Sequence, residues 1–208
     1  MNQGAAAARP IYEAFLQATD PRQKARLMYC GAAVVTKAGN RKPLEELVEN
    51  EIKNADRDVR VTAIRIARQY DVDLTKYASA AKDTAPEVRR ELALALRHSK
   101  SPDAAGLWAD LAMQHDGKDR WYLEALGIAA DQQWDAYLDA YLAKASEPWK
   151  SPAGRDILWR SRAKKTPELL VKIMKDPATK ETDQPRYFRA FDFLSGPEKE
   201  AALKSLLE

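Results

Sequence analysis

The feature that most constrains the fold is a helical pattern that recurs along the chain. An acidic residue, then Val-Arg and a stripe of small apolar residues, occurs at 58–65 and again at 87–94, an offset of 29 residues. The first helices of successive helix pairs are predicted to begin near positions 22, 55, 85, 118, 152 and 185, a period of about 30 to 34 residues. A period in this range is typical of helical solenoids. Because one pair cannot bury its apolar face alone, at least three pairs must stack to form a core.

The helix boundaries are marked because Gly and Pro mainly separate the segments of helical periodicity. No segment shows the period-two alternation of a half-buried strand. We therefore predict an all-α fold, a right-handed α-α superhelix of about six helix pairs. After a short capping helix over 11–18, the predicted helices cover 20–39, 42–51, 56–68, 84–98, a segment from 101, 117–130, 132–144, 153–163, 166–175, 184–194 and 197–207.

The domain organisation is predicted to be simple. Residues 1–10 are polar and rich in alanine, so we predict that this terminal segment is disordered. The remainder, 11–208, is predicted to form a single domain of helical repeats, because no linker divides it. The loosest join is 147–154, which contains two prolines.

The composition excludes several classes of protein. The chain has 34 Lys and Arg against 31 Asp and Glu, a net charge of +3, and no run approaches the roughly 18 apolar residues of a membrane helix. A lone cysteine, Cys30, excludes an internal disulfide, a CxxCH haem-attachment motif and a cysteine zinc site. We predict no metal, no cofactor and no enzymatic activity, since no catalytic motif is found. Cys30 lies in an apolar helical stretch and is expected to be a buried, small hydrophobic residue.

The arginine of the repeated pattern has a structural interpretation. Its valine and apolar stripe are expected to pack on the neighbouring helix pairs. The arginine is then expected to satisfy carbonyl groups between helices or an acidic residue of an adjacent turn. On this basis Asp83 is the candidate partner of Arg89.

Strings that mix aromatic and basic residues occur in three successive first helices, at 120–122, 159–162 and 186–189. They are compatible with a groove in which Arg holds phosphate or carboxylate and Trp stacks on a ring. Packing between repeats, with Arg bridging helix ends and aromatic faces, is the favoured interpretation. The candidate interaction surface consists of Arg120, Trp121, Arg155, Trp159, Arg160, Arg162, Arg186, Tyr187 and Arg189.

Four segments, 88–98, 114–128, 154–162 and 186–193, together resemble the HEAT-repeat segment of large secreted bacterial proteins of the PVC-type haem-binding, membrane-bound dehydrogenase-like family. Members of this family join such repeats to a β-propeller region and to a c-type cytochrome domain. This chain has no CxxCH motif, so the resemblance carries over no catalytic residue. It implies a HEAT-repeat scaffold whose partner is another domain or subunit of a redox protein. It also implies an extracytoplasmic, periplasmic location, although no secretory signal is recognised in the sequence.

The function expected from these features is that of a non-catalytic, monomeric HEAT-repeat scaffold that mediates protein–protein or interdomain interaction. The alternative is a nucleic-acid-binding HEAT protein of the DNA-alkylation-repair glycosylase type, with Asp119, Asp156 or Asp192 as its catalytic acid. The same acids are also ordinary helix caps or arginine partners. A net charge of +3 is far below that of a strongly basic nucleic-acid binder, which favours the scaffold.

Overall fold

The computed structural model describes residues 3–39 and 41–207, and in this part of the chain it contains helices and no strand. The prediction of an all-α fold is confirmed. The α-helices are α1 (Gln3–Gln17), α2 (Pro21–Lys37), α3 (Lys42–Glu51), α4 (Arg57–Gln69), α5 (Pro86–Ala95), α6 (Ala104–Ala112), α7 (Arg120–Ala129), α8 (Trp134–Lys144), α9 (Pro152–Arg160), α10 (Thr166–Lys175), α11 (Gln184–Ala190) and α12 (Pro197–Ser205). The 3₁₀ helices are η1 (Leu74–Lys82), η2 (Pro148–Lys150), η3 (Glu181–Asp183) and η4 (Phe191–Phe193).

The chain separates into two compact units, residues 1–95 and 96–208. The single domain expected over 11–208 stays a prediction. Residues 3–10, which the sequence analysis assigned to a disordered segment, lie in α1, and residues 1–2 lie outside the described residues. The alanine run at 5–8 explains this difference, because alanine has the highest helix propensity.

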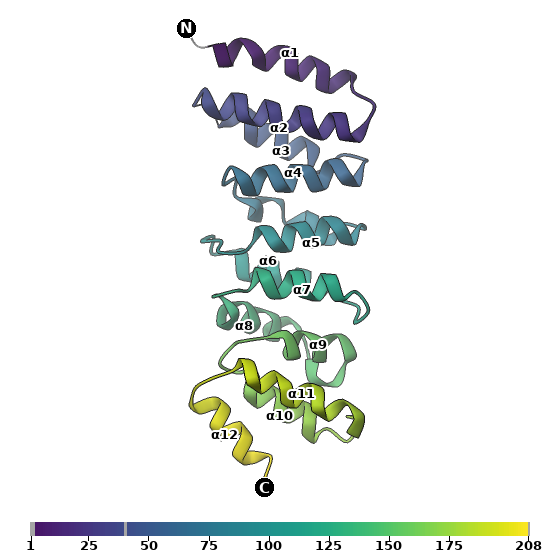
Figure 1. Cartoon of the computed structure of the whole chain (residues 1–208), viewed down its shortest axis with the longest axis vertical. Coiled ribbons are helices and arrows are strands. Elements are labelled where there is room, and N and C mark those ends of the chain that lie inside the picture. The colour runs from purple at the N-terminus through teal and green to yellow at the C-terminus, as the bar shows by residue number, and fades with distance from the viewer. Residues whose placement is uncertain (1–2, 40, 208) are drawn as a thin grey trace. The chain divides into compact units, whose positions relative to one another are not determined.

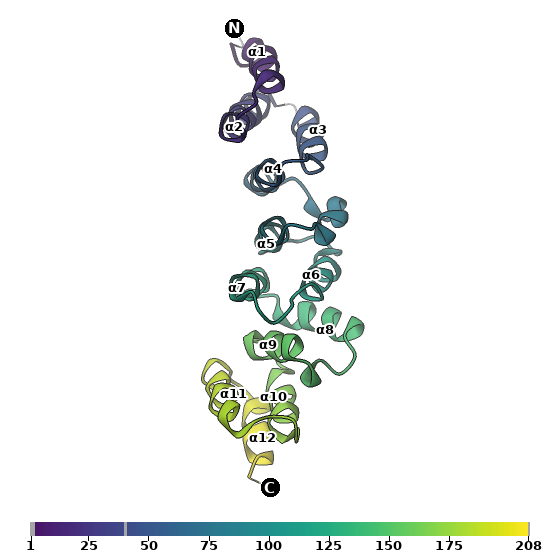
Figure 2. The same cartoon turned by 90° about the vertical axis from the view of Figure 1, so that its right-hand side faces the viewer.

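In the first unit the helices form two layers (Figures 1 and 2). One layer consists of α2, α4 and α5, with α1 packed on α2, and the other consists of α3 and η1. Val59, Ile64 and Ile66 of α4 are fully buried between neighbouring elements. η1 was not among the predicted helices, and its backbone departs from helical geometry at Tyr77. A 3₁₀ segment with such a kink lacks the apolar period by which an α-helix is recognised.

The second unit also has two layers (Figure 2). Here α7, α9 and α11 lie in one layer, and α6 packs on α8 while α10 packs on α12 in the other. Trp108 of α6 is 0% exposed and its indole Nε1–H donates to the Leu126 carbonyl of α7 over 3.0 Å. The rings of Trp134, Tyr137 and Tyr141 surround it, with centroids 5.5–6.5 Å from its own. This buried aromatic cluster is part of the core of the second unit.

Most predicted helix boundaries agree with the structure, and α3 and α10 agree to the residue. Three helices end three or more residues earlier than predicted, and one of them, α9, stops at Arg160 and not at residue 163. α5 stops at Ala95, three residues before His98, which has a left-handed φ of 60°. α11 stops at Ala190, and the chain continues as η4.

The prediction that Cys30 is buried is wrong, because its side chain is exposed. Met28 and Ala32 on the same helix are buried. Residues four apart share one face of a helix, and the residue midway between them points to the opposite side. Cys30 therefore lies on the outer face of α2.

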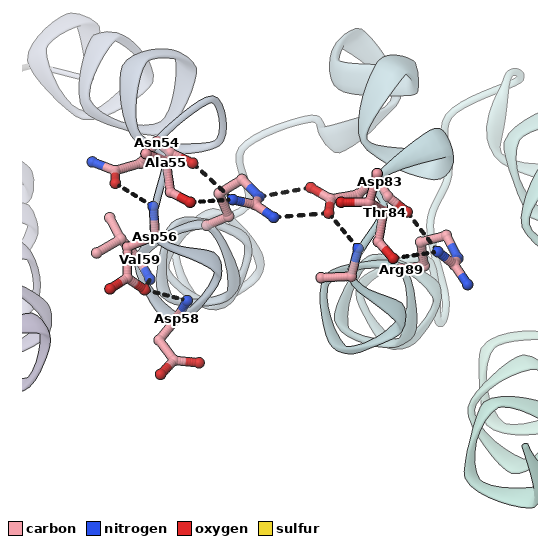
Figure 3. A network of polar contacts seen from close by, with 10 residues as sticks. Asn54, Ala55, Asp56, Asp58, Val59, Asp83, Thr84 and Arg89 are labelled. Atoms are coloured by element: carbon pink, nitrogen blue, oxygen red, sulfur yellow. Dashed lines mark hydrogen bonds and ion pairs between the residues drawn. The ribbon is translucent and has the colours of Figure 1, made fainter.

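The arginine of the repeated pattern makes the same backbone contacts in α4 and in α5 (Figure 3). Arg60 Nη1 donates to the carbonyl oxygens of Asn54 and Ala55, six and five residues before it, over 2.8 and 3.0 Å. Arg89 Nη1 donates to those of Asp83 and Thr84, again six and five residues before it, over 2.5 and 3.4 Å. The expectation that this arginine satisfies carbonyl groups is therefore confirmed.

The partner proposed for Arg89 needs a correction. Arg89 binds the backbone carbonyl of Asp83, while the Asp83 carboxylate forms a bidentate pair with Arg60, at 2.7 Å to Nε and 2.9 Å to Nη2. The carboxylate also accepts a hydrogen bond from the Ala85 N–H. Arg60 and Asp83 side chains are only 14% and 10% exposed. Arg60 thus connects α4, the first helix of its pair, to the turn that follows η1, the second helix of that pair.

Arg155 of α9 repeats this arrangement in the second unit. Its Nε donates to the carbonyl of Trp149, six residues before it, and its Nη2 pairs with Asp176 at 3.0 Å. Asp176 follows α10 as Asp83 follows η1, and it accepts the N–H of Ala178 two residues on. We call this set of contacts the Arg–Asp bracket, formed by Arg60 with Asp83 and by Arg155 with Asp176.

Replacing Asp83 by asparagine is expected to lower the free energy of unfolding by about 2 kcal/mol at pH 7, the typical contribution of hydrogen bonds to a charged group. Burial raises the pKa of Asp83, but the hydrogen bonds from Arg60 and Ala85 outweigh it and hold the pKa below its ordinary value. The contribution is therefore fully present above the ordinary carboxyl pKa and is lost as the pH falls through the lower native value.

Urea unfolding followed by circular dichroism over a series of pH values would measure this difference. The matched control is Asp58→Asn, because the Asp58 side chain is exposed and its ion pair with Arg57 is long, at 3.7 Å. The control should change stability by less than about 0.5 kcal/mol. An effect of Asp83→Asn that stays constant down to strongly acid pH would contradict the role given to the carboxylate.

Candidate binding pocket

Four of the nine candidate residues come together at one pocket of the second unit. The pocket has a volume of about 480 Å³ and lies where α9, α11 and η4 meet. Its lining combines three guanidinium groups with two aromatic rings and one carboxylate. The lining residues are Trp159, Arg162, Pro185, Arg186, Arg189, Asp192 and Phe193.

Arg186 is held in a fixed position on one wall. Its guanidinium lies over the Trp159 ring, with Cζ 4.5 Å from the ring centroid, and its Nη2 donates to Asp156 Oδ1 over 2.6 Å. The indole Nε1–H of Trp159 donates in turn to the Arg186 carbonyl over 3.2 Å. α9 and α11 are thus joined in both directions, which orients the cation and the ring together.

Arg162 forms a second wall and closes the end of α9. Its Nη1 donates to the carbonyl oxygens of Trp159, Arg160 and Ser161, over 3.1, 3.0 and 2.6 Å. These carbonyls have no partner within the helix, so the arginine acts as a C-terminal cap. Its Cζ lies 4.7 Å from the ring centroid of Phe193. Burial first, and the nearby charge of Arg160 second, lower the pKa of Arg162.

Asp156 connects the pocket to a buried histidine. Its Oδ2 lies 3.2 Å from His115 Nε2, while Oδ1 accepts from Arg186. Burial raises the pKa of Asp156, but the hydrogen bonds from His115 and Arg186 outweigh burial and hold the pKa below its ordinary value. The His115 ring is stacked against that of Tyr122, with centroids 6.2 Å apart. Asp156 is therefore an ionised partner of Arg186 that fixes the wall of the pocket.

Three of the other candidates serve packing instead. Arg155 belongs to an Arg–Asp bracket, and Tyr187 is buried. Arg160 Nε pairs with Glu124 Oε2 of α7 at 3.1 Å, and its guanidinium lies in the space above Gly127. For these residues the packing interpretation of the basic and aromatic strings is the one that fits.

The two candidates on α7 lie apart from the pocket lining. The side chains of Arg120 and Trp121 are exposed, and Trp121 is 71% accessible to solvent. Ile128, which was not among the candidates, is also exposed and lies seven residues from Trp121 on the same helix. Residues seven apart share a helix face, so α7 presents an apolar stripe to solvent.

The three acids considered for catalysis have different positions. Asp119 caps α7, accepting the Tyr122 N–H over 3.0 Å, and Asp156 pairs with Arg186 and His115. Asp192 lies at the pocket and is exposed. Two of the three are therefore a helix cap and an arginine partner, which are the structural roles weighed against catalysis.

The sequence analysis did not select Pro185 and Phe193 as site residues. Phe193 follows the string at 186–189 by only a few residues and is 66% exposed. An aromatic residue placed just after a basic helix was the available signal. Its neighbour Arg162 is distant in sequence, so only the return of the chain through α10 and α11 brings the two together.

Comparisons of the chain with protein-family models, with curated proteins and with solved structures find no match. Among residues 3–39 and 41–207, no group of three or more His, Cys, Asp or Glu side chains is arranged to hold a metal ion. Nor does any helix within those ranges have the length and apolar character that crossing a membrane requires.

Proposed function

We propose that the chain is a right-handed α-α superhelix of HEAT-like pairs, as expected from the repeated pattern. Two features support this architecture. In each unit the first helices of the pairs lie in one layer and the second helices in the other. The Arg–Asp bracket also occurs at equivalent positions inside two different pairs. Small-angle X-ray scattering provides the test. A compact chain of 208 residues has a radius of gyration of about 17 Å, and a solenoid should clearly exceed it.

We further propose that the chain is a non-catalytic scaffold that binds a protein partner, in line with the resemblance to the repeat segment of extracytoplasmic redox proteins. The observation that carries this proposal is the stripe of Trp121 and Ile128, two large apolar side chains exposed on α7. Arg120, which directly precedes Trp121, is also exposed on α7. Trp and Arg are the residues that most often dominate the energy of protein interfaces.

The nucleic-acid alternative has weaker support. It requires arginine and lysine side chains that converge on one uncompensated strip. Here Arg155, Arg160 and Arg186 pair with Asp176, Glu124 and Asp156 respectively. The first-helix layer of the second unit is thus of mixed sign, which suits a protein partner better than a polyanion.

Site-specific photo-cross-linking tests the scaffold function in the cells that produce the protein. The photoreactive residue p-benzoylphenylalanine is placed at Trp121, and in the control at Ala136, an exposed position of α8 in the other layer. A discrete adduct with one protein at position 121, absent at 136, is the expected result. Equal cross-linking at both positions, or none at either, would count against the proposal.

Titration with short single- and double-stranded DNA tests the alternative. Binding that falls log-linearly with salt and is lost in an Arg160→Ala, Arg162→Ala double variant would favour nucleic-acid binding. We expect no binding at low salt. A circular dichroism spectrum of the double variant is the necessary control, because both arginines make structural contacts.

A further inference from the structure

The pocket formed by α9, α11 and η4 has an excess of positive charge. Arg162, Arg186 and Arg189 contribute three cations to its lining, and Asp192 contributes one anion. Asp156, which is not part of the lining, neutralises Arg186 through an ion pair. One positive charge therefore remains uncompensated among these groups.

Of the three arginines, Arg162 is the best placed to bind an anion. None of the ion pairs among the described residues involves Arg162, whose Nη1 is occupied by three neutral carbonyls. The guanidinium has further N–H donors, on Nε and Nη2, in a fixed fork. Because the group is half-buried, an anion that reached it would be only weakly screened by water.

The remaining lining is apolar and planar. Trp159 and Phe193 each have an arginine stacked on one face, at 4.5 and 4.7 Å, and Pro185 adds a third apolar surface. Phe193 is largely exposed. An apolar ring or chain that entered the pocket would cover this surface beside the charged group, as in ligand sites with few polar groups in an apolar lining.

We propose that this pocket binds a carboxylate that is adjacent to an aromatic or large apolar side chain, as part of the protein partner. The pocket has room for two or three side chains, since its volume is about 480 Å³. A single excess positive charge matches a monoanionic carboxylate better than a dianionic phosphate. Arginine binds carboxylates through two parallel N–H donors, a geometry that the free side of the Arg162 fork offers. The proposal rests on the scaffold function and specifies what the scaffold recognises.

N-acetyl-L-phenylalanine is the simplest probe, because it joins one carboxylate to one aromatic ring. Binding is followed by the indole N–H signal of Trp159 in a proton–nitrogen correlation spectrum, assigned with Trp159→Phe. The Trp159 N–H donates to the Arg186 carbonyl, so the signal reports on the wall of the pocket. Saturable shifts are expected with this probe and none with N-acetyl-L-phenylalaninamide, which lacks the charge.

Two variants locate the site. Arg189→Gln and Phe193→Ala should each weaken binding about fivefold, the loss expected for one exposed ionic or aromatic contact. Both side chains are exposed, and Arg189 takes no part in the hydrogen bonds described above that hold the pocket walls in place. Arg120→Gln is the matched control, since the Arg120 side chain is 82% exposed on α7. Its affinity for the probe should equal that of the wild type.

Further probes identify the source of the carboxylate. N-acetyl-Glu-Phe-amide presents a side-chain carboxylate, whereas N-acetyl-L-phenylalanine presents a terminal one, and saturable binding of either supports the proposal. Tighter binding of phenyl phosphate would overturn it in favour of a phosphate ligand. Equal shifts with acid and amide, or no shift with any probe, would also overturn it. If cross-linking at Trp121 finds a partner while the probes fail, the scaffold function stands and the pocket proposal falls.

Discussion

Replacing Trp108 by alanine is expected to lower the free energy of unfolding by about 4 kcal/mol, the largest effect among the substitutions considered. The side chain is fully buried and contacts the rings of Trp134, Tyr137 and Tyr141. Its removal leaves a cavity that these large rings fill only in part. It also leaves the Leu126 carbonyl without the indole N–H. Urea unfolding followed by circular dichroism measures the change.

Two controls separate the contributions at this position. Trp108→Phe retains an aromatic ring but removes the hydrogen-bond donor to the Leu126 carbonyl, so the free energy of unfolding should fall by about 1.5 kcal/mol. Trp121→Ala removes the same side chain from an exposed position of α7 and should change stability by less than about 0.5 kcal/mol. Similar losses for Trp108→Ala and Trp121→Ala would contradict the arrangement of the core.

Replacing Gly154 by alanine is expected to lower the free energy of unfolding by about 3 kcal/mol. A Cβ atom at this position would lie 2.1 Å from the carbonyl oxygen and 2.8 Å from the Cα of Pro148. These are backbone atoms of η2, so no side-chain rotation relieves the clash. α9 and η2 would have to separate, which also weakens the cap in which Ser151 Oγ accepts the Gly154 N–H. A melting temperature lowered by roughly 10 °C is the expected observation.

Two other helical glycines provide a graded comparison. A Cβ at Gly106 meets nothing within 4 Å, so Gly106→Ala should stabilise α6 by up to about 1 kcal/mol. At Gly127 the nearest atoms belong to the Arg160 guanidinium, 2.3 Å away, and a flexible side chain can move. Gly127→Ala should therefore cost about 1 kcal/mol, mainly through the displaced Arg160–Glu124 pair. A neutral Gly154→Ala would show that η2 does not pack on α9 as described.

The helices were predictable where local chemistry marks their ends. α3 and α10 were predicted to the residue because Pro follows their first residue and apolar periodicity continues to their last. η1 was missed because a kinked 3₁₀ segment has no regular apolar spacing. The burial of Cys30 was mispredicted because an apolar stretch alone does not show which face of α2 is covered.

The residue types of the candidate site could be predicted from the sequence, but the ion pairs that its arginines form could not. Basic and aromatic residues were identified in α7, α9 and α11, and the pocket draws on the last two. Which arginines are neutralised depends on acids such as Asp156 and Glu124, each brought close by stacking of separate helices. The same limit explains why the Asp83 carboxylate was assigned to Arg89. The sequence places Asp83 nearest to Arg89, whereas the fold turns its carboxylate toward the preceding Arg60.

The Arg–Asp bracket closes entirely within one helix pair. Arg60 and Asp83 are 23 residues apart, and Arg155 and Asp176 are 21 apart, so neither bracket needs a residue from another pair. A gene segment that encodes one pair would therefore encode both residues of that pair's Arg–Asp bracket when it is duplicated. A protein engineer who adds or removes one pair would keep the contacts inside every pair, and would have to match only the contacts between pairs, such as that of Arg160 with Glu124.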